Sequence, residues 1–520
     1  MPARARLRSM RRSTLAGLMA ATLLTGCAAS RTTERRHATQ PAYGSYLRGL
    51  LLERASNYPA ALNAYDAALA HDHESPLLYV REGATYLKLG DAAHALRAFN
   101  KALELDPQHP DALRWLATVH LAQGHLPEAV AAYERLLALA PEDPFLLSTL
   151  ADLYVLQDQL PKAVALYQQL IRDSGPTSQL HFNLGMLYGR MGQYREALYE
   201  LSRAYELSPN TLEIRVALGL TEELSGDYAQ AAAHYEGAIQ LDPFNPRLYH
   251  HAARAYLGAG RLQDAALRYQ AVLDLTPHDL EAIMGLTRAW VAQQRFDEAL
   301  QLLGRKLTEL NEPAELYVAL GLVYREAKQA QEAMRAFERA TERRPDYAQA
   351  QFYLGAQLDQ LNRRDEARLR LRRTIELDDR HADAMNYLGY LDVEDGLDLP
   401  EAKRLIERAL ELDPDNGAYV DSLGWAYFKM GDVIRAIPLL ERAAALDDTD
   451  PVVFDHLGEA YLSQRDIEKA RASWTRAMAM DPTQTAIQEK LKRLPPAPQT
   501  ERAHGRAEDP TPAELPAATR

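Results

Sequence analysis

An alanine recurs every 34 residues through most of this 520-residue chain, and this period constrains the fold more than any other feature of the sequence. One interval, from Ala367 to Ala402, is 35 residues long, and every other interval is 34. A fixed period of this length is typical of an array in which one supersecondary unit repeats and neighbouring units bury a continuous core. The thirteen alanines are Ala61, Ala95, Ala129, Ala163, Ala197, Ala231, Ala265, Ala299, Ala333, Ala367, Ala402, Ala436 and Ala470.

Each alanine lies within the same short pattern of residues. One clear copy consists of Tyr79, Gly83, Tyr86, Ala95, Phe99, Ala102 and Pro107, and another of Tyr317, Gly321, Tyr324, Ala333, Phe337, Ala340 and Pro345. Within a unit the apolar and small residues lie three and four apart, which predicts two amphipathic helices. Glycines such as Gly124 and prolines such as Pro127 predict the turn between these helices. We therefore predict an all-α fold with thirteen helix-turn-helix units over residues 42–484 and a capping helix over residues 485–494.

This pattern resembles the tetratricopeptide repeat. The resemblance implies that the units stack into a right-handed superhelical solenoid whose concave wall is lined by the first helix of each unit. It also implies that protein or peptide partners bind on that wall. Two units depart from the pattern, because Thr287 replaces the usual glycine in residues 280–313 and an extra residue is present in residues 382–416. We expect a hinge or a change in superhelical pitch at these two units.

The N-terminal residues form a different kind of segment. Arginines at positions 4, 6, 8, 11 and 12 precede an apolar run over residues 15–24, which is too short to span a bilayer comfortably. This arrangement predicts a secretory signal peptide over residues 1–26. The closing Leu24, Thr25, Gly26 and Cys27 resemble the bacterial lipobox, which implies cleavage before Cys27 and acylation of that residue. Since Ala28 follows instead of aspartate, the resemblance further implies an outer-membrane lipoprotein that faces the periplasm.

Composition supports the assignment of the remaining segments. Cys27 is the only cysteine of the chain, so an acylated Cys27 leaves no disulfide. Residues 27–41 are short and polar and predict a lipidated tether, and residues 495–520 are rich in proline and charge and predict disorder. The net charge of −13 becomes −18 without residues 1–26, because these contain five arginines and no acidic residue. A surface of this charge argues against nucleic acid as a partner.

The repeats leave no room for a separate catalytic domain. The sequence has no phosphate-binding glycine loop, no His-Glu-x-x-His zinc motif and no nucleophile elbow. The best metal-like cluster consists of the consecutive residues His71, Asp72, His73 and Glu74, whose side chains point in different directions. We therefore predict neither an enzyme nor a metal site, and we expect no cofactor.

Two groups of residues are candidates for partner binding on the first helices. The favoured contact site has aromatic rings beside carboxylates, which suits a basic or amphipathic peptide, and consists of Asn386, Tyr390, Asp421, Trp425, Phe428, Asp455 and Glu459. A second, basic group consists of Arg247, His250, Arg254 and Arg288. The alternative for both groups is structural: the rings pack against the neighbouring unit, and the charges are solvated.

These observations predict a lipid-anchored periplasmic scaffold that binds peptide segments for an envelope assembly, such as polysaccharide-export, pilus or secretion, or cell-wall machinery. A periplasmic chaperone or pilotin for an outer-membrane subunit is the alternative. The sequence does not distinguish between oligomeric states.

Overall fold

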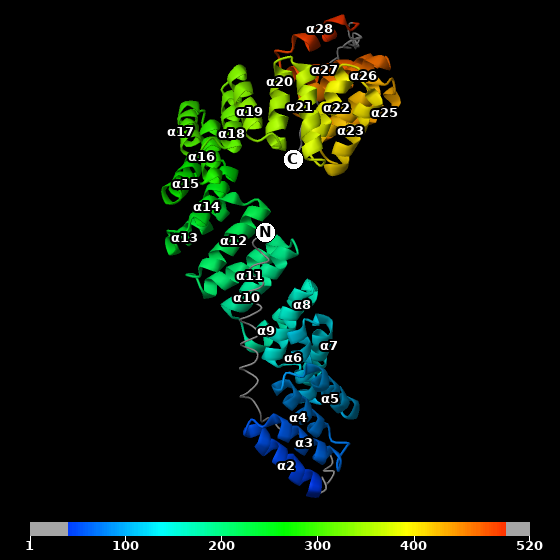
Figure 1. The fold of residues 1–520 in the computed structure, drawn as a ribbon. Helices are drawn as coiled ribbons and strands as arrows, with labels where there is room; N and C mark the ends of the chain where they lie inside the picture. Colours follow the sequence, from blue (N-terminus) through cyan, green and yellow to red (C-terminus); the bar gives the residue numbers. More distant parts are fainter. Residues whose placement is uncertain (1–39, 496–520) are drawn as a thin grey trace, which may run out of the picture. The chain divides into compact units, whose positions relative to one another are not determined.

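The computed structural model describes residues 40–495, in which every regular element is an α-helix (Figure 1). The chain divides into two compact units, the first ending at Arg261 and the second beginning at Leu262. The described helices of the first unit are α2 (Gln40–Arg54), α3 (Tyr58–Leu69), α4 (Pro76–Lys88), α5 (Ala92–Leu105), α6 (Pro110–Gln123), α7 (Leu126–Leu139), α8 (Pro144–Leu156), α9 (Leu160–Ser174), α10 (Ser178–Arg190), α11 (Tyr194–Leu207), α12 (Leu212–Ser225), α13 (Tyr228–Leu241) and α14 (Pro246–Gly258). Those of the second unit are α15 (Leu262–Leu275), α16 (Leu280–Ala292), α17 (Phe296–Glu309), α18 (Ala314–Glu326), α19 (Ala330–Arg343), α20 (Ala348–Gln360), α21 (Arg364–Leu377), α22 (Ala382–Glu394), α23 (Leu399–Leu412), α24 (Gly417–Lys429), α25 (Val433–Leu446), α26 (Pro451–Ser463), α27 (Ile467–Met480) and α28 (Thr485–Arg493).

These helices confirm the predicted all-α array. From α2 to α27 they form thirteen consecutive helix-turn-helix repeats, and α28 follows the last repeat. In each repeat the even-numbered helix comes first and the odd-numbered helix second. The predicted signal peptide over residues 1–26, most of the tether over residues 27–41 and nearly all of the tail over residues 495–520 lie outside the described residues.

Local sequence determines where the helices begin and end. Helix α6 begins with Pro110, whose missing amide hydrogen is not needed in the first turn, and Nδ1 of His109 accepts a hydrogen bond from the amide of Ala112. The same helix ends at Gly124, which has φ +79° and therefore adopts a left-handed conformation that glycine tolerates without strain. The glycine that predicted the turn after α6 therefore forms that turn.

Close contact between the two helices of a repeat depends on its small residues. All thirteen periodic alanines have an exposed fraction of 0%. A Cβ atom added to Gly83 would lie 2.6 Å from Cε1 of Phe99, so the ring fills the space that the glycine leaves open. A larger side chain at either position would force the helices apart, because protein cores are close-packed. This requirement explains why small residues recur with the period.

The extra residue of the eleventh repeat lies in the turn between α22 and α23. This turn runs from Asp395 to Asp398, and Gly396 adopts φ +68°. Asp398 has φ +34° and accepts a hydrogen bond from the amide of Glu401, so it caps α23. The helices still pack closely, since a Cβ atom on Gly389 would lie 2.7 Å from Cγ1 of Ile406. The turn therefore absorbs the insertion.

Several pairs of consecutive first helices contact one another directly within each unit. These contacts join α4 to α6, α10 to α12, α16 to α18, α18 to α20, α22 to α24, and α24 to α26. Among residues 40–495, no second helix contacts the next second helix to a comparable extent. First helices therefore lie closer together than second helices, and we call their shared face the inner wall of each unit.

The division between the two units falls inside the seventh repeat. The hinge or change in superhelical pitch at the eighth and eleventh repeats stays a prediction. In the first unit α14 packs on α13, where the rings of Tyr235 and His251 stack with centroids 5.1 Å apart. In the second unit α15 packs on α16, where a Cβ atom on Gly285 would lie 2.3 Å from the ring of Tyr269. Each of these helices thus has a close neighbour within its own unit.

Candidate functional site

The favoured contact site lies in the second unit, on the inner wall formed by α22, α24 and α26. Its seven predicted residues come from these three consecutive first helices. Asp421 and Trp425 are buried, with exposed fractions of 5% and 8%, while the other five are half-buried. The helix-helix contacts bring the members of this site together, and their side chains have more partners inside the protein than the sequence indicated.

Asp421 forms the polar centre of the site together with a residue that the sequence analysis missed. His456 of α26 is buried, and its Nδ1 lies 2.8 Å from Oδ2 of Asp421. The other carboxylate oxygen of Asp421, Oδ1, is buried and has no hydrogen-bond partner among the described residues. A buried acceptor without a donor is energetically costly, so this oxygen favours the approach of a hydrogen-bond donor.

A second unpartnered acceptor lies on the neighbouring helix. The side-chain oxygen of Asn386, Oδ1, is also buried without a partner among residues 40–495. The repeat register places Ser422 opposite Asn386, as it places His456 opposite Asp421. The hydroxyl of Ser422 instead donates to the carbonyl of Ala418 at 2.9 Å. Asn386 therefore lacks the cross-repeat donor that Asp421 has.

Trp425 connects the aromatic part of the site. Its ring stacks on Phe428, with centroids 4.8 Å apart, and on His456, with centroids 4.0 Å apart. The indole nitrogen Nε1 donates to Oε1 of Glu394 at 2.5 Å, and Nζ of Lys429 lies 5.1 Å from the ring centroid. This ring therefore packs against the neighbouring repeat, which is the structural alternative given for this site. It also stacks against the half-buried Phe428.

Tyr390 borders the buried histidine at the centre of the site. Its ring centroid lies 6.2 Å from that of His456. Burial, together with the negative charges of Glu394 and Asp421, raises the pKa of the Tyr390 hydroxyl. This hydroxyl therefore remains protonated at physiological pH and keeps its hydrogen-bond donor.

The two remaining acids are held by the capping helix. Nζ of Lys490 in α28 lies 2.7 Å from Oδ1 of Asp455 and 2.8 Å from Oε1 of Glu459. Burial opposes the charged form of Lys490, but the hydrogen bonds to these two acids outweigh it and raise the pKa of Lys490. Trp474 also donates from Nε1 to Oδ1 of Asp455 at 2.8 Å. The acidic end of the site is thus partly neutralised by the chain itself, because one cation faces two carboxylates.

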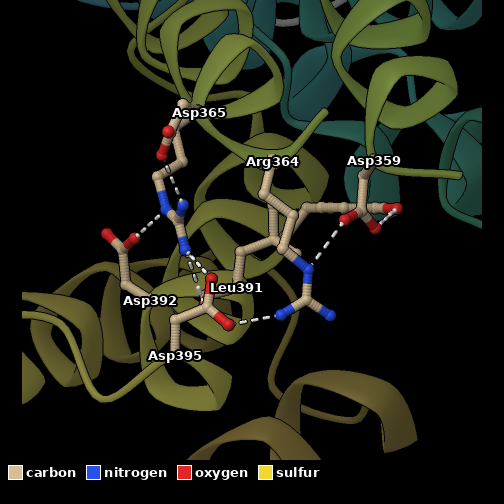
Figure 2. A network of polar contacts seen from close by, with 8 residues as sticks. Asp359, Arg364, Asp365, Leu391, Asp392 and Asp395 are labelled. Atoms are coloured by element: carbon tan, nitrogen blue, oxygen red, sulfur yellow. Dashed lines mark hydrogen bonds and ion pairs between the residues drawn. The ribbon is translucent and has the colours of Figure 1, made fainter. Parts of the chain in front are cut away.

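A buried ion network fixes α22, the first helix of the site, against the preceding repeat (Figure 2). Arg368 of α21 is 7% exposed, and its Nε donates to Oδ1 of Asp392 at 2.7 Å. The same guanidinium pairs with Asp395, and this hydrogen bond lowers the pKa of the Asp395 carboxyl. Arg364 also pairs with Asp395 and lies 3.5 Å from Asp359 of α20. The network therefore joins α20, α21 and the end of α22.

The second, basic group does not lie within one compact unit. Arg247, His250 and Arg254 lie on α14 of the first unit, whereas Arg288 lies on α16 of the second unit. Arg254 pairs with Glu223 of α12 at 2.5 Å, so part of its charge is neutralised. Arg247 and Arg288 are exposed.

Three further observations concern lipidation, metal binding and membrane crossing. Cys27 lies outside the described residues. Within residues 40–495, no group of three or more His, Cys, Asp or Glu side chains is arranged to hold a metal ion. The helices described there are also too short or too polar to cross a bilayer.

Three family models, all described as tetratricopeptide repeat, match this sequence. The first matches residues 80–144, 182–246 and 392–451, the second matches residues 121–181 and 257–317, and the third matches residues 314–347. Together the matches span more than half of the chain, in both units. They include α24 and part of α22 in the candidate site.

Comparison with other proteins adds only distant likenesses. No curated protein matches the sequence. Among solved structures, the chain is similar to the APC/C hetero-tetramer Cut9-Hcn1, with 16% identity, a TM-score of 0.43, and 88% of this chain and 96% of that chain covered. It is also similar to yeast Tom70, with 17% identity, a TM-score of 0.37, and 87% and 99% of the two chains covered. At such low scores these likenesses carry no information about function.

Proposed function

The chain belongs to the tetratricopeptide repeat family, and from this premise we propose that it is a lipid-anchored scaffold of the bacterial envelope. Proteins of this family bind protein partners. In this proposal the partner contributes a basic segment, which binds on the inner wall of α22, α24 and α26. The acylated Cys27 holds the array at the periplasmic face of the outer membrane.

The observation that carries the binding proposal is the unpartnered carboxylate oxygen of Asp421. This oxygen and the side-chain oxygen of Asn386 are buried acceptors on neighbouring first helices. An arginine or lysine side chain supplies several N–H donors and a positive charge, and so satisfies a carboxylate better than a neutral group does. The aromatic rings of Tyr390 and Phe428 beside these acceptors supply apolar contact area. The site therefore suits a cationic side chain carried by a peptide.

The anchoring part of the proposal is supported by sequence alone. Cys27 follows an apolar run and is the only cysteine of the chain. A single acyl chain binds membranes only marginally, whereas several chains on one residue anchor firmly. Metabolic labelling with radioactive palmitate in the host, with Cys27→Ser as the comparison, tests this part. Equal labelling of both proteins would exclude the anchor.

Capture of partners from detergent-solubilised envelope tests the binding site. Asp421→Asn is the informative substitution, because it removes the charge but keeps the size of a buried side chain. We expect Asp421→Asn to lose the partners of the parent protein. Glu411→Gln, at an exposed position of the second helix α23, should retain them. Retention of all partners by Asp421→Asn would exclude this site.

The same host strain separates the scaffold from the chaperone or pilotin alternative. Deleting a scaffold mislocalises several partners, whereas deleting a pilotin depletes one outer-membrane multimer. No described residue favours the second outcome, and the scaffold therefore remains our proposal.

A further inference from the structure

One position of the first described helix differs in its exposure from the equivalent position of every later repeat. Leu51 of α2 lies two residues after Gly49, the tight glycine of the first repeat, and is 69% exposed. The equivalent residues of the other twelve repeats have exposed fractions of at most 7%, and they are Thr85, Val119, Leu153, Leu187, Thr221, Ala255, Ala289, Val323, Gln357, Leu391, Ala426 and Ala460. In those repeats this position is covered by the preceding repeat. No described residue covers Leu51.

Leu51 belongs to an apolar stripe along α2. Leu47 and Tyr43 lie four and eight residues earlier, on the same helix face, and are 41% and 56% exposed. The opposite end of the array is closed differently, because α28 exposes the polar residues Gln488, Glu489, Lys492 and Arg493. End repeats of solenoids generally need such a polar outer face for solubility. The stripe on α2 is therefore an apolar surface that requires an explanation.

We infer that this stripe, Tyr43, Leu47 and Leu51, docks on the surface of a lipid bilayer. The surrounding sequence is basic in an otherwise acidic protein, since residues 28–54 contain five arginines and two glutamates. Two of these arginines, Arg48 and Arg54, lie on α2 itself and are exposed. Apolar side chains flanked by arginines bind anionic lipid surfaces through both burial and charge. The stripe has this chemistry.

The other occupants fit the stripe less well. Residues 28–39, directly before α2, contain no apolar side chain larger than alanine and cannot cover two leucines and a tyrosine. A second copy would bury only three large side chains, far fewer than the roughly 20 residues a side of a stable interface. A bilayer needs no complementary pocket. The inference rests on the proposed acylation of Cys27, which would hold Tyr43 within about 55 Å of the membrane, at about 3.4 Å per residue.

Site-specific fluorescence tests this inference, because replacing Cys27 leaves the chain without cysteine. The test protein is the chain from residue 27 onward with Cys27→Ser, so that it carries no lipid. Leu51→Cys is labelled with an environment-sensitive nitrobenzoxadiazole dye and mixed with vesicles of phosphatidylethanolamine and phosphatidylglycerol. Leu369→Cys is the matched control, because Leu369 is 64% exposed on the second helix α21. We expect a blue shift and an intensity increase of at least about twofold at position 51 and neither at position 369.

A charge substitution supplies the second measurement. Leu51→Asp should lower the fraction of unlipidated protein that sediments with these vesicles about tenfold, whereas Leu369→Asp should leave it unchanged. Both leucines are exposed, so neither substitution disturbs the core. Equal sedimentation of Leu51→Asp and the parent would overturn the inference. A dye response that depends on protein concentration without vesicles would assign the stripe to a second copy instead.

The two experiments distinguish a failure of this inference from a failure of the anchoring proposal. Vesicle binding by the unlipidated protein reports on the stripe alone, and palmitate labelling in the host reports on Cys27 alone. If Cys27 is not acylated but the stripe binds vesicles, the anchor proposal fails and the docking surface stands. If palmitate labels Cys27 and the dye at position 51 does not respond to vesicles, the anchor proposal stands and the docking surface fails.

Discussion

Replacing Glu222 by glutamine should make the sixth repeat more stable at neutral and alkaline pH but not at acidic pH. Glu222 of α12 is 8% exposed, and its Oε2 has no hydrogen-bond partner among the described residues. Its Oε1 lies 3.4 Å from Nε2 of His234. Burial and the negative charge of Asp227 raise the pKa of Glu222 to about 8, whereas burial and Arg215 lower the pKa of His234. Both side chains are therefore neutral in the folded protein at pH 7.

The size and sign of the effect follow from this pKa. The ordinary pKa of a glutamate side chain is 4.5, and the folded state raises it to about 8, so the folded state binds the proton more tightly than the unfolded state. The stabilising contribution is fully present below pH 4.5 and is lost as pH rises through the folded pKa. One pKa unit corresponds to about 1.4 kcal/mol, so the full loss above pH 8 is about 5 kcal/mol at most. Glutamine does not titrate and avoids this loss.

Hydrogen exchange measured by mass spectrometry is the appropriate assay, because an array of repeats need not unfold in one step. Exchange in α12 and α13 is compared between Glu222→Gln and the parent at the same pH, so that intrinsic exchange rates cancel. The variant should be more protected by less than about 1 kcal/mol near pH 5, about 3 near pH 7 and about 5 near pH 9. Glu213→Gln, at an exposed position of the same helix, is the control. A difference that is constant with pH, or largest at acidic pH, would show that Glu222 does not have a raised pKa in the folded protein.

Three further substitutions test the packing of the second unit. Arg368→Met leaves the buried carboxylate of Asp392 without its cation and should destabilise α21 and α22 by about 3–5 kcal/mol, measured by hydrogen exchange; unchanged exchange would contradict the network. Gly458→Ala places a Cβ atom 2.4 Å from Nε1 of Trp474 and should lower the stability of the last repeat by about 1–3 kcal/mol, with a change in tryptophan fluorescence. Lys490→Met removes the cation from two half-buried acids and should increase exchange in α28, whereas Lys492→Met, on its exposed side, should not.

Much of the fold could be predicted from the sequence, because the 34-residue period results directly from helix packing. An alanine with no exposed surface recurs in every repeat, and only a small residue fits where two helices touch. The length of the turn at Gly396 was also visible as the single 35-residue interval. By contrast, the division at Arg261 has no comparable signal, since the seventh repeat keeps Ala253 and Ala265 at its two small positions.

The partners within the candidate site were predictable in principle but were missed. His456 lies 35 residues after Asp421, and Lys490 lies 35 residues after Asp455. In both pairs the second residue lies one position beyond the 34-residue equivalent of the first, on α26 or α28, so the register alone would have suggested them. The burial of Trp425 could not be deduced in this way, because a ring at that position packs inward or faces solvent depending on side-chain rotamers. Whether the site binds a partner remains a prediction.

Photocrosslinking in the native envelope can show whether a basic segment of a partner binds on the inner wall of α22, α24 and α26. A benzoylphenylalanine residue replaces Phe428, which is half-buried on the inner wall beside Trp425, or Tyr199, which is 64% exposed on the second helix α11. We expect crosslinks to protein segments rich in lysine or arginine from position 428, their loss in Asp421→Asn, and none of them from position 199. Equal crosslinking from both positions, or crosslinked segments without basic residues, would contradict this expectation.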